Sequence, residues 1–496
     1  MPGHGPALNW SGILVNFATA LYEHDLIVNF ISSDIGNQAD MQRHSLDLVL
    51  LKFSTGEYHP LARRPQIHVQ RSPEVEPWVV SKIVGDNLAL VVHSDDGMFS
   101  DKLIIFEWKT GRRLLQHEAT ENAYSSLVFV SPELLLVTNR VLSHLEVWHI
   151  PPQQPNPKPP IQILSLQIPA VSLDYSLFDF DCYGESNPFL HSTPYLPTPR
   201  PFFSSPKNSI IMVTLRLSSN AGRRTSYNLI VHRRALLDRI HTLTSPSLLE
   251  QQECLSTWLT NEVTVHKTTD PENEFVELEA RSELVSTMPH PRSSPRTHDF
   301  PTFPTSQTSQ TLPTSHIFAD PGTSSVSSGL STDSSTSRCT FLQVPWAKWG
   351  PPVSRWFQLN ETQAWCVTSS NGQRYAFSEP NPLNGRKLMV SVVDFNPHNF
   401  RRNAEMMARL QGGEAENNGS AGNNEEGKEE EEEEEFETLD HKGVFSEEVY
   451  MGLKCVVYRA PDEYDFDAVV MDEQRLLGVK LKRHNSGESV KVLYIG

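Results

Sequence analysis

Residues 78–116 constrain the fold of this chain more than any other stretch, because they hold four short β-rich runs separated by turn residues. The four runs are Val79–Val84, Asn87–His93, Lys102–Trp108 and Arg112–Gln116. None is long enough to prefer a helix, and the second is almost wholly apolar, as in a strand buried on both faces. A lone four-stranded sheet cannot bury both of its faces, so the stretch predicts neighbouring copies of itself.

Similar units precede and follow this stretch. Upstream, LLKFSTGEYHPLA (Leu50–Ala62) aligns with IFEWKTGRRLLQH (Ile105–His117), with an aromatic residue over an aromatic residue and Thr-Gly over Thr-Gly. The strands predicted for this first copy are Leu26–Ser32, Leu46–Phe53 and Glu57–Leu61. A third copy spans Ser125–Ile168, where Trp148 ends the third run and a proline-rich loop replaces the Thr-Gly turn.

Three further units follow, the first of which begins at Leu173 and is interrupted by loops. Their predicted strands include Ile210–Leu217, Tyr227–Val231, Trp365–Ser369, Arg374–Phe377, Leu388–Val393, Leu453–Tyr458, Ala468–Met471, Leu476–Lys482 and Val490–Ile495. A short helix is expected at His232–Ile240, where apolar residues share one face. Once insertions are removed, the units recur at roughly 40 to 50 residues, which is typical of β-propeller blades.

The sequence therefore predicts an all-β fold, with residues 1–496 forming a single β-propeller of six to seven four-stranded blades, similar to WD-repeat proteins. The segment before Leu26 could belong to a further blade or pair with the C-terminal strand. A two-sheet sandwich or a pair of all-β domains is the alternative, but four runs per unit and the recurring aromatic residue favour the propeller. Apolar positions predicted to be buried are Leu90, Val92, Ile105, Leu135, Val137, Val147, Val469 and Leu477.

Two segments of low complexity interrupt the repeats and are predicted to be disordered insertions. The first covers about 266–341, and 33 of the 60 residues from 281 to 340 are Ser, Thr or Pro. The second covers about 403–443 and contains consecutive glutamates at 429–435. Neither has the apolar content to offset the entropy lost on ordering.

Charge and cysteine usage narrow the class of protein. The formal net charge is -18, but residues 411–440 hold thirteen acids and one base, which leaves the rest of the chain only mildly acidic. A nucleic-acid binder needs a concentrated basic surface, so no nucleic acid is expected as partner.

Five scattered cysteines without a Cys-x-x-Cys pair favour reduced thiols in an intracellular protein, cytoplasmic or nuclear. No apolar segment reaches the roughly 18 residues of a membrane span, so the protein is not expected to bind a membrane.

No catalytic, cofactor-binding or metal-binding motif is present, so no such residue and no cofactor is predicted. The densest aromatic stretch supplies the candidate partner-binding residues Trp346, Trp349, Arg355 and Trp356. Trp and Arg are enriched among the residues that dominate binding energy at protein interfaces. The alternative is that these rings pack between blades beneath the turn at 350–352.

Several motifs in a fixed order resemble one family. They are IVGDNLALVV (Ile83–Val92), EWKTG (Glu107–Gly111), PRPFF (Pro199–Phe203), VHRRALL (Val231–Leu237), VPWAKWGPPVSRWF (Val344–Phe357), VVDFNP (Val392–Pro397) and YDFDAVVMDEQRLLGVK (Tyr464–Lys480). Together they resemble the propeller-like region of the F-box proteins of mushroom-forming basidiomycete fungi. The resemblance covers the ordered chain from about residue 20 to residue 496.

In that family an F-box docks on the Skp adaptor of a cullin-RING ubiquitin ligase, and the β region is thought to hold a substrate. Strand-like sequence begins here almost at once, so the chain is expected to bind a Skp-type adaptor only in a longer form that carries an F-box. The leading hypothesis is a non-enzymatic protein-interaction propeller with an unidentified protein partner. The alternatives are a propeller enzyme of the hydrolase or lactonase type, with polar side chains converging on a channel, and an inactive paralogue.

Overall fold

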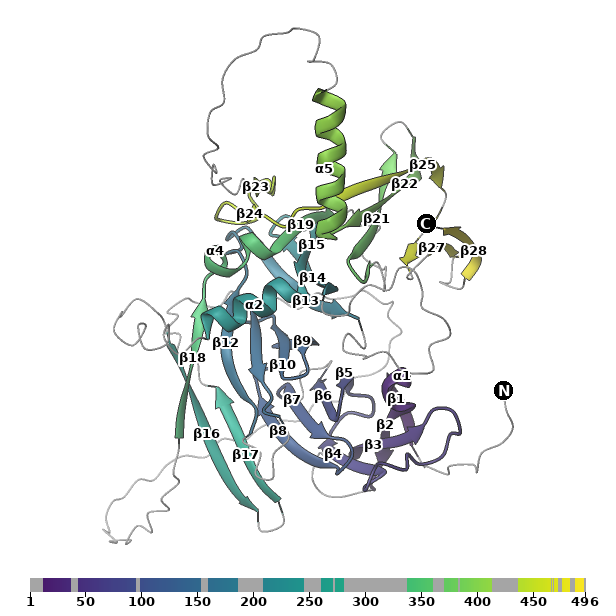
Figure 1. Cartoon of the computed structure of the whole chain (residues 1–496). Coiled ribbons are helices and arrows are strands. Elements are labelled where there is room, and N and C mark those ends of the chain that lie inside the picture. The colour runs from purple at the N-terminus through teal and green to yellow at the C-terminus, as the bar shows by residue number, and fades with distance from the viewer. Residues whose placement is uncertain are drawn as a thin grey trace, which may run out of the picture. The chain divides into compact units, whose positions relative to one another are not determined.

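The computed structural model describes residues 12–36, 43–94, 99–152, 159–185, 208–244, 260–270, 273–280, 337–359, 370–381, 384–412, 436–464, 466, 468–471, 475–481 and 487–494. These residues belong to one unit, formed by 1–281 and 336–496, and they are predominantly β (Figure 1). The predicted all-β class is therefore confirmed. None of the helices in these ranges is long and apolar enough to cross a membrane.

The strands follow one another in antiparallel units of three or four. The first holds β1 (Ile13–Ala20), β2 (Leu26–Asp34), β3 (His44–Lys52) and β4 (Gln66–Ser72). The second holds β5 (Trp78–Val84), β6 (Asn87–His93), β7 (Lys102–Glu107) and β8 (Arg112–Glu118), and the third holds β9 (Tyr124–Ser131), β10 (Leu134–Asn139), β11 (His144–His149) and β12 (Ile161–Gln167). The four predicted strands of the second unit lie within two residues of the observed bounds.

Three further units follow in the described part of the chain. The fourth combines β13 (Tyr175–Gly184), β14 (Ile210–Ser219), β15 (Arg224–His232) and β19 (Ser354–Leu359), and the fifth combines β20 (Ser370–Asn371), β21 (Arg374–Asn381), β22 (Asn384–Asp394) and β25 (Val456–Tyr464). The sixth contains β26 (Ala468–Met471), β27 (Arg475–Leu481) and β28 (Gly487–Tyr494). Remaining elements are α1 (Leu21–His24), α2 (Arg233–Leu243), β16 (Thr260–Asp270), β17 (Asn273–Ala280), β18 (Ser337–Val344), α4 (Trp346–Trp349), η2 (Pro351–Val353), α5 (Pro397–Gly412), β23 (Glu437–Thr438) and β24 (Tyr450–Met451).

Neighbouring units share apolar clusters, and β6 shows how. Its residues Leu88, Leu90 and Val92 belong to a cluster with the first sheet, whereas Ala89 and Val91 belong to a cluster with the third unit. Side chains alternate between the two faces of a strand, so this apolar run packs one unit against each side. The prediction that β6 is buried on both faces is confirmed.

Further clusters continue this order along the chain. One joins the third and fourth units, a smaller one joins the fourth and fifth, and another joins the fifth and sixth. Of the eight predicted core residues, seven are buried; Leu477 is only half-buried, and its neighbour Leu476 is buried instead. Successive side chains of a strand point to opposite faces, so the prediction named the residue beside the one that faces the core.

The predicted strand at Glu57–Leu61 is wrong. This segment forms a loop, held to β3 by a bridge between Leu51 and Tyr58, and β4 at 66–72 is the fourth strand instead. Pro60 has no N–H to donate to a strand ladder and fixes its own φ, so the segment cannot continue the hairpin.

Parts of both predicted insertions lie in strands or in a helix. Three strands, β16, β17 and β18, contain parts of the first predicted insertion, namely residues 266–270, 273–280 and 337–341. Strand β16 pairs with β17 and with β18, and the three strands lie between β8 and β12 (Figure 1). The sequence NEFVELEA of β17 alternates apolar and polar residues, as a strand does, and Ser/Thr/Pro-rich sequence begins only after it. Residues 281–336 lie outside the described part of the chain.

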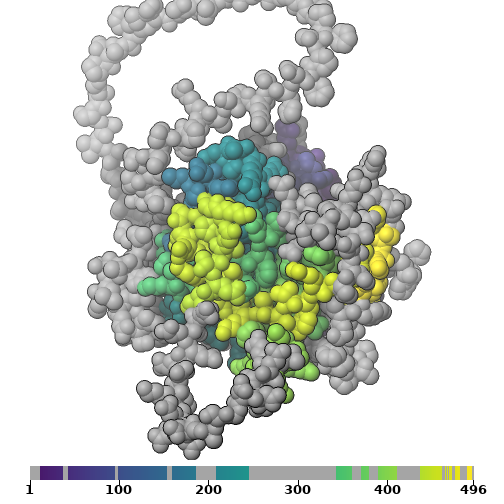
Figure 2. Space-filling model, turned by 90° about the horizontal axis from the view of Figure 1, so that it is seen from above, coloured from purple at the N-terminus to yellow at the C-terminus, as the bar shows by residue number. Residues whose placement is uncertain are grey.

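The second predicted insertion also contains ordered ends. Helix α5 begins at Pro397 and includes residues 403–412 of this predicted insertion. The side chain of Asn396 accepts the N–H of His398, and Pro397 stands at the first helical position, so both residues favour a helix start here. The segment 436–451 carries Val444 and Phe445 into the cluster of the third and fourth units (Figure 2, yellow-green). Residues 413–435 lie outside the described ranges.

A buried polar network ties the second unit to the third. Tyr124 donates its hydroxyl proton to Glu146 Oε2 at 2.9 Å, and Trp148 donates to the same oxygen at 3.1 Å. The Tyr124 amide donates to Asp101 Oδ2 at 2.8 Å. Burial raises the pKa of Asp101 to about 6 from its ordinary value of 3.8, despite the backbone N–H groups that favour its charged form.

We predict that Leu90→Ala lowers the free energy of unfolding by about 2 to 5 kcal/mol, because it leaves a cavity between two units. Leu61→Ala is the control, since Leu61 is 55% exposed, and it should change stability by less than about 0.5 kcal/mol. Urea unfolding followed by far-ultraviolet circular dichroism measures both. Equal stabilities for the two variants would show that β6 does not lie in a core.

The raised pKa of Asp101 predicts a specific pH dependence of stability. The folded state holds the Asp101 proton more tightly than the unfolded state, so this contribution is present below about pH 4 and is lost as pH rises through about 6. Asp101→Asn should remove a fall of about 2 to 3 kcal/mol over that interval. Asp174→Asn, at an exposed position, should retain the wild-type slope. Identical slopes for wild type and Asp101→Asn in urea titrations would refute this assignment.

Candidate anion-binding pocket

The structure places the three predicted tryptophans in the core. Trp346, Trp349 and Trp356 are at most 3% exposed, with ring centroids of Trp346 lying 5.1 Å from Trp349 and 5.5 Å from Trp356. Gly350 is required there, because a Cβ at this position would overlap the Trp346 ring. The burial favours the packing interpretation of these rings over the prediction that they bind a partner.

Arg355, the fourth predicted partner-binding residue, is engaged within the chain. Its guanidinium makes a two-pronged contact with Glu437, at 3.0 Å for Nη1–Oε1 and 2.6 Å for Nη2–Oε2. These hydrogen bonds lower the pKa of Glu437. Arg355 thus joins the segment containing β23 to β19.

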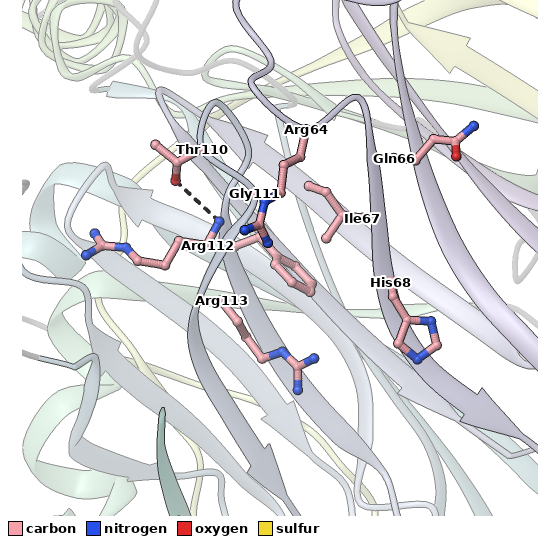
Figure 3. Close-up of a pocket in the computed structure, with 9 residues that line it drawn as sticks. Arg64, Gln66, Ile67, His68, Thr110, Gly111, Arg112 and Arg113 are labelled. Atoms are coloured by element: carbon pink, nitrogen blue, oxygen red, sulfur yellow. Dashed lines mark hydrogen bonds between the residues drawn. The ribbon is translucent and has the colours of Figure 1, made fainter. Parts of the chain in front are cut away.

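A pocket of about 400 Å³ lies elsewhere, between β4 of the first sheet and the hairpin that joins β7 to β8 (Figure 3). We call it the arginine pocket, and its lining includes Arg64, Gln66, His68, Phe106, Arg112 and Arg113. Its size falls within the range of small-ligand sites. A backbone hydrogen bond of 2.7 Å from Arg63 N to Lys109 O joins the two loops that form its rim.

The β7–β8 hairpin fixes one wall of the pocket. Gly111 has φ of +75°, which a glycine adopts without strain, and a Cβ there would lie 3.1 Å from Cβ of Arg64. Thr110 donates its hydroxyl to Glu107 Oε2 at 2.6 Å, and Arg112 Nη2 lies 3.4 Å from the same oxygen. Glu107 therefore offsets the charge of Arg112, whose side chain points away from Arg64 (Figure 3).

Two further guanidinium groups, those of Arg64 and Arg113, line the pocket. Arg113 lies 5.8 Å from the centroid of the Phe106 ring and contacts Gln116 and the carbonyl oxygen of Val69. Burial lowers the pKa of Arg113. The exposed side chain of Arg64 extends over Gly111 (Figure 3), and no hydrogen bond or ion pair of its guanidinium is formed within the described ranges.

Gln66 and His68 form the opposite wall. His68 Nδ1 lies 2.9 Å from Asp47 Oδ1, and Gln66 donates to the hydroxyl of Tyr58 at 3.0 Å. The pocket thus has an excess of positive charge in a chain that is acidic as a whole. Guanidinium groups beside an apolar ring suit a carboxylate or phosphate. No group of three His, Cys, Asp or Glu side chains suited to a metal ion occurs in the part of the chain that the structure describes.

These arginines are not among the residues predicted from the sequence, although one signal was available. In the alignment of the first two units, Glu57 and Tyr58 stand where the second unit has Arg112 and Arg113. A charge present in one copy and absent from its repeat is not required by the repeat fold. Arg64 could not be found this way, because only the tertiary structure brings it to Gly111.

Comparisons with known proteins identify no family for this chain. No family description and no curated protein matches the sequence. Among solved structures, the structure of Kluyveromyces lactis Hsv2p is similar over 54% of this chain and 97% of that chain, with 7% sequence identity and a TM-score of 0.15.

We predict that Gly111→Ala destabilises the protein more than Gly56→Ala. Both glycines have φ of +75° in equivalent Thr-Gly turns, so both variants incur about 1 to 2 kcal/mol of backbone strain. Only the Cβ at position 111 meets another side chain, that of Arg64, since nothing lies within 4 Å of position 56. Thermal unfolding of the two variants isolates this contact. A Gly56→Ala variant as unstable as Gly111→Ala would contradict the packing described for the pocket.

Proposed function

We propose that this chain is a protein-interaction β-propeller, with the successive sheets as its blades, comparable to the substrate-recognition region of an F-box ubiquitin-ligase subunit. The support for a propeller is the order of the apolar clusters, each shared by units adjacent in sequence. Faces buried between successive four-stranded units are what propeller blades require. A Skp-type adaptor enters this proposal only through a longer form that carries an F-box.

The observation that carries the binding role is the arginine pocket. Arg64 and Arg113 present positive charge at the junction of two sheets, while the chain as a whole carries -18. A partner protein with acidic side chains would gain charge-assisted hydrogen bonds there and would be repelled by much of the remaining surface. The pocket is the site at which this proposal places such a partner.

Capture from an extract of the native cells tests this role with two matched charge reversals. Arg64→Glu should lower the recovery of a specific partner at least about tenfold, because a charged hydrogen bond worth about 1.5 to 3 kcal/mol is replaced by repulsion. Arg63→Glu is the control, since Arg63 is adjacent, exposed and outside the pocket lining. Quantitative mass spectrometry compares the three samples, with melting temperatures confirming that each is folded. A partner recovered equally by all three proteins would contradict the proposal.

A further inference from the structure

We propose that helix α5 (Pro397–Gly412) is a docking helix for the acidic, methionine-lined groove that a calcium-loaded EF-hand sensor protein exposes. The helix contains none of the residues that line the arginine pocket, so this inference does not rest on the proposed function. The anchoring of the helix, the exposure of its apolar side chains and the charge of its polar face carry it.

The first turn of α5 is fixed to the end of β22. Asp394 is buried, and its carboxylate accepts the backbone N–H of Asn396 at 2.8 Å and the side-chain amide of Asn399 at 2.9 Å. In addition, Lys454 Nζ lies 5.7 Å from the centroid of the Phe400 ring, which is a cation–π contact with the segment that leads into β25. The helix therefore leaves the sheet in a defined direction.

Beyond this turn the helix is exposed (Figure 1). Of residues 401–409, all are exposed except the half-buried Asn403, and Met406 and Met407 are 53% and 47% exposed. Most of the stability of a helix in a protein comes from packing its amphipathic face, and a helix of this length is marginal in water without such packing. A partner that covers the apolar side chains would therefore stabilise the helix as it binds.

The sequence of α5 separates apolar from basic residues. Phe400, Ala404 and Met407 recur at intervals of four and three residues, so they share one face. The opposite face carries the charged and titratable residues His398, Arg401, Arg402, Glu405 and Arg409. Three arginines and one glutamate give this face a net charge of +2, whereas the chain as a whole carries -18.

This pattern specifies the groove that the helix fits. Amphipathic helices bind proteins by laying their apolar face into an apolar groove, and arginines on the other face favour carboxylates along the rim. Calcium-loaded EF-hand sensors open such a groove, lined with methionine, between helices that flank carboxylate-rich loops. Methionine side chains adapt to irregular apolar surfaces, so the two exposed methionines of α5 suit a groove of this kind.

A membrane with anionic lipids is the other surface that a basic amphipathic helix fits. Residues 413–435, which follow the helix directly in sequence, contain eleven acids and one base. A bilayer presents negative charge over its whole plane and would repel these acids, whereas a groove confines its carboxylates to the helix. The charge pattern therefore favours the protein partner.

Fluorescence anisotropy of dye-labelled calmodulin, titrated with the full chain, tests the inference. With calcium present the dissociation constant should be about micromolar or lower. Chelating the calcium should weaken binding at least about tenfold, because the methionine-lined groove closes. Vesicles containing phosphatidylserine are titrated in parallel and should not bind the chain.

Four variants tie the binding to α5. Met407→Glu should weaken calmodulin binding at least about tenfold, because it places a carboxylate on the apolar face while keeping a good helix former, and Arg402→Glu should weaken it at least about threefold. Leu61→Glu is the matched control, since Leu61 is 55% exposed and lies outside the helix, and it should bind within about twofold of wild type. Arg64→Glu should also match wild type, and melting temperatures confirm that each variant is folded.

Three results overturn the inference: no calmodulin binding in calcium, binding that survives chelation, and equal binding by Met407→Glu and wild type. Vesicle binding without calmodulin binding also overturns it and would make α5 a membrane-binding helix. None of these results bears on the proposed function, which the Arg64-dependent capture of a partner tests separately.

Discussion

The contact of Trp108 with the first sheet is the interaction on which the described arrangement depends. The indole is fully buried, donates its N–H to the carbonyl oxygen of Gly85 at 3.0 Å, and lies 5.2 Å and 5.0 Å from the rings of His24 and His59. The two histidines belong to the first unit and the tryptophan to the second. An aromatic ring at the end of a third strand therefore locks its own unit to the preceding one.

The same arrangement recurs one unit later. Trp148 ends the third strand of the third unit, and its ring lies 5.0 Å from His117 at the end of the second. Because Trp108 is followed directly by the turn at 109–111, locking the ring also fixes the hairpin that carries Arg112 and Arg113. The arginine pocket is thus a consequence of how two units are joined, with Arg64 supplied by the loop that leads into β4.

Much of the fold could be predicted from local sequence, because apolar alternation and turn glycines determine most of these strands. Errors arose where another effect dominated: Pro60 displaced the fourth strand of the first unit, and the cap at Asn396 began a helix in sequence expected to be disordered. The tryptophans at 346, 349 and 356 are buried, and the sequence alone could not decide between a buried and an exposed cluster. The pocket escaped prediction because Arg64 reaches the β7–β8 hairpin only through the packing of two units.

An experimental structure of the full chain bound to an acidic segment of a captured partner would test the central claim most directly. It should show carboxylate groups of the partner peptide beside the guanidinium groups of Arg64 and Arg113, with Trp108 seated against His59. Density for the peptide on another face, with both arginines turned to solvent, would contradict it.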